Sequence, residues 1–166
     1  MTDLQDQRKY GALTPVWALF LLGGVFVLVV GGPGVGLALS QAPIDRAFHD
    51  TYYVVAQLHY TVSIAVWFLA LAAIYSALGR WTRLPIPRWA ELVHFAMFFV
   101  GVCLMFMPQQ LLGRQSMPRR YIDFGEQMAF WNFWSTLGAS LAVASLVFFL
   151  SVLGLAFYRR QSARPA

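Results

Sequence analysis

The chain has 166 residues, of which 59% are apolar and only 11% are charged, and its mean hydropathy is +0.60. Soluble globular domains carry about 25% charged residues, so this composition excludes a soluble globular domain and a disordered protein. The net charge of +5 comes from short clusters between long uncharged stretches, which indicates membrane topology rather than nucleic-acid binding. The single cysteine excludes an intrachain disulfide and a cysteine-based metal site, and we expect Cys103 to be a small buried apolar residue.

Four stretches without Lys, Arg, Asp or Glu follow one another along the chain. Each exceeds the ~20 residues that a helix needs to cross ~30 Å of hydrocarbon. We therefore predict transmembrane helices at roughly 15–39, 52–78, 90–112 and 130–157. The predicted fold class is an all-α integral membrane protein. It comprises an N-terminal segment (1–13), a four-helix transmembrane domain (14–158) and a basic tail (159–166).

Glycine and proline mark where these helices approach one another or end. Gly23-Gly24 and Gly31-Gly32-Pro33-Gly34 interrupt the first span, which indicates a close packing face or a kink. The segment 80–88 contains Pro85 and Pro87, so it separates the second and third helices.

The distribution of basic residues predicts orientation in the membrane. One side holds eight (Arg8, Lys9, Arg80, Arg83, Arg88, Arg159, Arg160, Arg164) and the other holds four (Arg46, Arg114, Arg119, Arg120). We predict a multi-pass protein of a bacterial inner membrane with both termini cytoplasmic. Arg119 and Arg120 form an adjacent pair on the translocated side, against the usual bias, so we expect an anionic partner there. The alternative is that they extend to lipid headgroups.

Two histidines lie in the spans, at opposite depths. His59 is about seven residues into the second helix, ~10 Å deep at 1.5 Å per residue, where an imidazole needs a partner. Cofactor ligation, a hydrogen bond to a neighbouring helix and a water pocket all remain open. His94 begins the third helix on the cytoplasmic side, so the two cannot bind one iron within a monomer. We expect His94 to be a satisfied polar residue near the interface.

His49 and Asp50 precede the second helix on the translocated side. Capping of that helix by Asp50 is the simplest interpretation, and binding of a hard cation or an acidic cofactor edge are alternatives. The aromatic residues predicted to form a belt at this interface are Tyr52, Tyr53, Trp131 and Trp134.

The string HDTYYVVAQLHY, from His49 to Tyr60, closely resembles the helix X motif of subunit I of haem-copper oxidases of the cytochrome c oxidase type. Two further strings agree with it in collinear order: SQAPIDR (40–46), and PQQLLG (108–113) followed by MPRRYID (117–123). The resemblance extends from about Ala12 to Tyr158. It implies the fold of helices IX to XII, the last third of a twelve-helix subunit.

The resemblance assigns roles to individual residues. It implies that His59 is the axial iron ligand of a low-spin haem, of a or b type, and that Arg119 and Arg120 bind the haem propionates. His49 and Asp50 match residues beside a non-redox magnesium site and the propionates. The arginine pair and His59 were placed at the same end of the membrane by charge and depth, and guanidinium–carboxylate pairing suits propionates.

Departures from the family pattern matter equally. Gln57 stands where the family has the His ligand of the oxygen-reducing haem. Residues i and i+2 of a helix point ~200° apart, so losing that ligand need not disturb His59. The family's copper ligands lie on helices with no counterpart here, so we expect no copper and no oxygen reduction by this chain alone, and we assign no catalytic residue. Gln110 and Phe124-Gly125 also depart from the pattern.

These residues predict a haem-binding membrane cytochrome that transfers electrons or stores haem. A low-spin haem needs two strong axial donors, so we expect the second from another chain, most simply from a second copy in a C2 homodimer. Three alternatives remain: a C-terminal fragment of a split oxidase of the cytochrome c oxidase type, an accessory or assembly subunit of such a complex, and a scaffold that binds nothing. The expected surroundings are the lipid bilayer, without nucleic acid.

Overall fold

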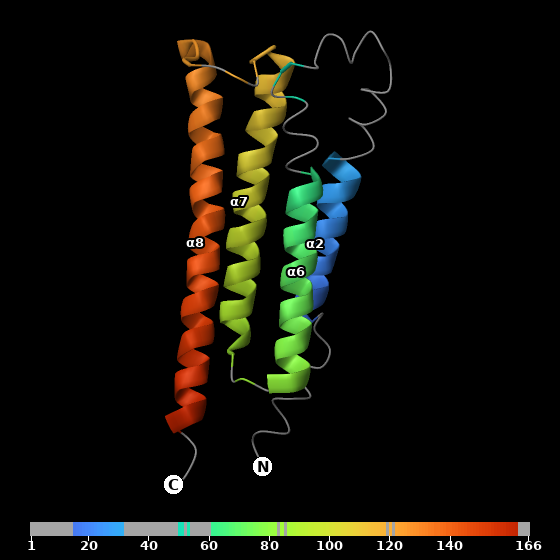
Figure 1. Cartoon of the computed structure of the whole chain (residues 1–166), viewed down its shortest axis with the longest axis vertical. Helices are drawn as coiled ribbons and strands as arrows, with labels where there is room; N and C mark the ends of the chain where they lie inside the picture. The colour runs from blue at the N-terminus through green and yellow to red at the C-terminus, as the bar shows by residue number, and fades with distance from the viewer. Residues whose placement is uncertain are drawn as a thin grey trace.

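The computed structural model describes residues 15–31, 50–51, 53, 61–82, 84, 86–118, 120 and 122–162. These residues are almost entirely helical: α2 (Val16–Gly31), α6 (Ser63–Ala77) extended by a π-helical turn η2 (Leu78–Thr82), α7 (Arg88–Arg114) and α8 (Glu126–Ser162). Figure 1 shows the four helices side by side, each running opposite to the one before it in the chain. The predicted all-α class is confirmed.

Three of the described helical segments are long and apolar enough to cross a membrane: Ser63–Trp81, Arg88–Arg114 and Glu126–Ser162. A shorter apolar helix, Val16–Val29, accompanies them. The predicted four-helix membrane fold is confirmed. The part of the first predicted span beyond Gly31, and most of the first turns of the second, lie outside the described residues. The last helix continues past Tyr158 to Ser162, so the predicted basic tail begins within a helix.

The break between the second and third helices lies in the proline-containing segment, as the sequence predicts. The second helix continues through η2 to Thr82, somewhat beyond the predicted end. Pro87 is extended (φ −70°, ψ 136°) and directly precedes α7, a position where its missing N–H and fixed φ cost nothing.

Helices α7 and α8 approach closely at small residues. A Cβ atom on Gly101 would lie 2.6 Å from the Ala142 amide nitrogen, and one on Gly138 would lie 2.6 Å from the Leu104 carbonyl carbon. Lipid tails are as apolar as the side chains, so helices in a bilayer associate through van der Waals packing rather than the hydrophobic effect. Close backbone approach is therefore what holds this pair together.

The paired glycines of α2 have the same role against α6. A Cβ on Gly23 would lie 2.7 Å from the ring of Phe68, and one on Gly24 would lie 3.0 Å from the Phe68 Cβ. Of the two predicted roles of Gly23-Gly24, a packing face or a kink, the packing face is confirmed.

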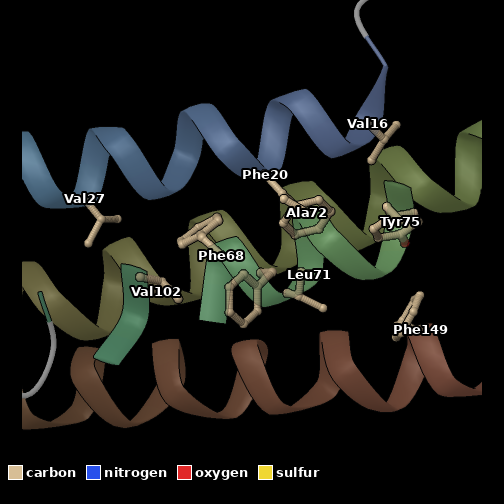
Figure 2. Close-up of a cluster of buried hydrophobic side chains, with 10 residues drawn as sticks. Val16, Phe20, Val27, Phe68, Leu71, Ala72, Tyr75, Val102 and Phe149 are labelled. Atoms are coloured by element: carbon tan, nitrogen blue, oxygen red, sulfur yellow. The ribbon is translucent and has the colours of Figure 1, made fainter. Parts of the chain in front are cut away.

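Side chains from all four helices meet in one aromatic core (Figure 2). Its members are Val16, Phe20, Val27, Phe68, Leu71, Ala72, Tyr75, Phe98, Val102 and Phe149. Phe20 and Phe68 are fully buried, and the Phe68 and Phe98 rings meet edge to face with centroids 5.0 Å apart. Ring pairs of this geometry fix the relative rotation of the helices. Cys103 lies outside this core and is partly exposed, so its predicted burial is wrong.

His94 is buried among the core side chains of the bundle. It is 0% exposed, its Nδ1 lies 2.9 Å from the Tyr75 hydroxyl, and its ring stacks on Phe149 at 4.8 Å. The expected hydrogen-bond partner is confirmed, and the expected depth near the membrane interface stays a prediction. Because α7 begins at Arg88, His94 is nearly two turns inside the helix.

Candidate functional site

The two segments that carry the predicted site residues touch at one end of the bundle. Thr51 pairs with Pro118 in an isolated antiparallel bridge. Tyr53 is only 7% exposed, and a Cβ added to Gly113 would collide with its backbone nitrogen. The start of the string that leads to His59 therefore lies against the end of α7, directly before the segment that carries Arg119 and Arg120.

Thr51 accepts a hydrogen bond at the start of this segment. Its Oγ1 accepts the backbone N–H of Tyr53 at 3.2 Å, the kind of bond that caps a helix N-terminus. Capping by Asp50, the role that the sequence favours, stays a prediction, and Asp50 is exposed next to Thr51. The prediction that Tyr53 belongs to an aromatic belt is wrong, because its side chain is buried and its backbone packs against Gly113.

Met117 anchors the turn that follows α7. Its side chain is 0% exposed, its backbone N–H donates to the Leu112 carbonyl at 3.1 Å, and its sulfur lies 3.8 Å from the Asn132 amide nitrogen of α8. Ser116 adopts a left-handed conformation (φ 61°), which lets the chain reverse within so few residues. The turn holds Pro118 against Thr51 and leads directly into the arginine pair.

Of the predicted site residues, Asp50 and Arg120 are described, and both are exposed. His49, His59 and Arg119 lie outside the described residues. The structure thus brings together the sequence neighbours of both motifs. Iron ligation by His59 and propionate binding by the arginines stay predictions.

Several polar atoms are buried without a hydrogen-bond partner in the half of the bundle that contains the contact between Thr51 and Pro118. Within the described part of the chain these include Thr61 Oγ1, Gln109 Oε1 and both polar atoms of the Gln110 amide. Buried polar groups are normally paired, so each such atom needs an explanation. Gln109 is half satisfied, because its Nε2 donates to Ser135 Oγ at 2.6 Å. The sequence analysis noted Gln110 but not Gln109, although both are amide side chains within an apolar stretch and could have been recognised from that pattern.

No group of three or more His, Cys, Asp or Glu residues that could hold a metal ion occurs among the residues that the structure describes. His59, the metal ligand that the sequence predicts, lies outside those residues.

The chain also resembles known proteins in sequence. The family profile described as cytochrome c and quinol oxidase polypeptide I matches residues 9–141. Cytochrome c oxidase subunit 1 of Cereibacter sphaeroides is 52% identical over 135 residues, which cover 81% of this chain and 24% of that protein. Cytochrome c oxidase subunit 1 of Mytilus edulis is 36% identical over 141 residues, covering 82% of this chain and 24% of that protein.

The chain thus spans about a quarter of the length of the curated relatives that it matches. The matched region contains α2, α6 and α7 in full and the first part of α8, up to residue 141, and it contains the contact between Thr51 and Pro118. Fold, motif order and sequence similarity agree: the chain belongs to the cytochrome c and quinol oxidase polypeptide I family.

Proposed function

We propose that this chain is a haem-binding membrane cytochrome that transfers electrons or stores haem, with His59 as an axial ligand and the second axial ligand from another chain. The observation that carries the proposal is the contact of Thr51 and Tyr53 with Gly113 and Pro118. This contact supports a single site, because it joins the segment leading to His59 with the one leading to Arg119 and Arg120.

The donor chemistry of these residues fits haem. An imidazole at His59 is a strong axial donor, and the arginine pair would hold the propionates through charge-assisted, often bidentate hydrogen bonds. His49 and Asp50 would lie beside the propionates. The unpartnered amide of Gln110 and hydroxyl of Thr61 supply further polar atoms in this half of the bundle. Bound haem, of a or b type, would supply one-electron redox chemistry.

The second axial ligand is proposed to come from a second copy of the chain. The sequence holds three histidines. His94 is enclosed by its own bundle, with Tyr75 on its Nδ1 and the ring of Phe149 stacked against it. His94 is therefore enclosed in the core, and His49 is assigned beside the propionates, so His59 of a partner related by a twofold axis is the simplest second donor.

Optical spectroscopy of the purified protein tests this proposal. We expect a haem spectrum that His59→Ala abolishes and that His59→Met, which offers another axial donor, retains in shifted form. The matched control is His94→Phe, which keeps a ring in the aromatic core and should leave the haem spectrum unchanged. Native mass measurement should give one haem for two chains. Haem that survives His59→Ala, or one haem bound to one isolated chain, would contradict the proposal.

A second candidate is a component of a split cytochrome c oxidase-type complex, as a fragment or as an accessory subunit. Only 17–28% of each long apolar segment is buried within the described part of the chain, which leaves extensive apolar surface for further helices. Mild solubilisation from its native membrane distinguishes the two. A large membrane subunit that co-purifies in fixed stoichiometry favours the complex, and a homodimer without it favours the cytochrome.

A further inference from the structure

An apolar groove of about 590 Å³ runs along the flank of the α7–α8 pair. On α7 it extends from Phe99 to Leu111, and on α8 it is bounded by Phe130, Trp131 and Trp134. Its volume lies within the range of small-ligand pockets, about 300–1,000 Å³. The groove is distinct from the contact between Thr51 and Pro118, because none of those contact residues lines it.

The dimensions of the groove match one hydrocarbon chain within one leaflet. Twelve residues separate Phe99 from Leu111, which is ~18 Å along a helix at 1.5 Å per residue. Half of a bilayer core is ~15 Å thick. The two tryptophans lie toward one end, and tryptophan is enriched where the membrane core meets the headgroups. The lining is wholly apolar, so it provides no hydrogen-bonding group to a ligand in the groove.

Arg114 lies at one end of the groove. Arg114 follows Leu111 by three residues and Met107 by seven, so it shares the helix face that lines the groove. Arg114 is exposed. On α8, the exposed Gln127 precedes Trp131 by four residues and lies one turn above it. Glu126 precedes Phe130 by four residues, so its carboxylate lies at the same end of the groove, on the side of α8 away from Trp131.

We propose that this groove binds an anionic phospholipid, with one acyl chain between α7 and α8 and the phosphodiester against Arg114 and Gln127. The guanidinium supplies the charge and up to two hydrogen bonds to phosphate oxygens, and the amide supplies another donor. The inference does not depend on haem binding. It concerns the opposite flank of α7 from Gly113 and uses none of the proposed haem ligands.

Phosphatidylglycerol is the sharpest probe, because its phosphate is its only charge. Nanodiscs of phosphatidylcholine that contain increasing amounts of phosphatidylglycerol with brominated acyl chains should show quenching of tryptophan fluorescence. Trp131→Phe/Trp134→Phe should remove the saturable part of that quenching. Diacylglycerol with the same brominated chains lacks the phosphate and should bind more weakly.

Arg114→Gln should weaken phosphatidylglycerol binding about fivefold, the effect of one arginine near a membrane surface. It should leave diacylglycerol binding unchanged. The matched control is Arg159→Gln at the other end of α8, which removes the same charge and should change neither lipid's binding. Cys103→Phe, which fills the groove, should weaken binding of both lipids.

Three results would overturn the proposal: equal affinities for the two lipids, equal effects of the two arginine substitutions, or quenching that survives Cys103→Phe. A further outcome, in which Cys103→Phe separates a dimer and no lipid saturates, would assign the groove to a second copy and likewise overturn it. Circular dichroism confirms that each variant is folded.

Discussion

Adding one methyl group at Gly113 should separate the two segments of the candidate site. A Cβ at this position would lie 2.7 Å from the Tyr53 Cβ and would collide with the Tyr53 backbone. Non-bonded carbon atoms are most stable about 3.5–4.0 Å apart. The Tyr53 segment must therefore move by roughly 1 Å in Gly113→Ala, because backbone atoms cannot rotate aside as a side chain can.

Overpacking of this kind costs about 1–3 kcal/mol, which lowers the population of the docked segment about 5-fold to 150-fold. The bridge between Thr51 and Pro118 supplies an assay that is independent of haem. Bridged antiparallel residues have Cα atoms about 4.5–5.5 Å apart, within the range that a disulfide spans. In a Cys103→Ser background, the Thr51→Cys/Pro118→Cys pair should therefore oxidise readily.

Gly113→Ala should slow this oxidation at least about fivefold, following the lower end of the overpacking cost. The control is Gly154→Ala on α8, where an added Cβ meets nothing within 4 Å and the rate should stay the same. Mobility on gels after timed oxidation measures the rate. If Gly113→Ala forms the disulfide as fast as its parent, the two segments are not held together by this contact, and the main support for a single site is lost.

Two further predictions concern the core. Gly138→Ala should lower the free energy of unfolding by about 1–3 kcal/mol, because the added Cβ collides with the backbone of α7. Gly154→Ala on the same helix should not lower it, and unfolding by SDS in mixed micelles, followed by far-UV circular dichroism, compares the two variants. In the same assay, Tyr75→Phe should lower the free energy of unfolding by about 1–3 kcal/mol, because it leaves the buried His94 Nδ1 unpaired. Tyr158→Phe, at a residue that is 69% exposed, should leave this free energy almost unchanged, and equal effects of the two substitutions would contradict the Tyr75–His94 hydrogen bond.

The sequence alone determined the number of helices and their type, and it gave approximate bounds for the helix ends that the structure describes. Long uncharged stretches leave a chain in lipid little choice, since a helix satisfies every backbone amide within one segment. Pro85 and Pro87 marked the break before α7, and Gly23-Gly24 marked a close contact. The motif around His59 and the arginine pair identified the family before any geometry was known.

The rotation of each helix about its own axis was decided only by the tertiary structure. In water an apolar stripe reveals the buried face, but in a bilayer apolar residues face both the core and the lipid, so the pattern carries little directional signal. The sequence therefore did not show that the side chains of His94 and Tyr53 are buried inside the bundle, and Cys103, which was expected to be buried, is partly exposed on the flank of α7. Packing against particular neighbours, such as Phe149 on His94 and Gly113 on Tyr53, fixed those positions, and no local pattern encodes them.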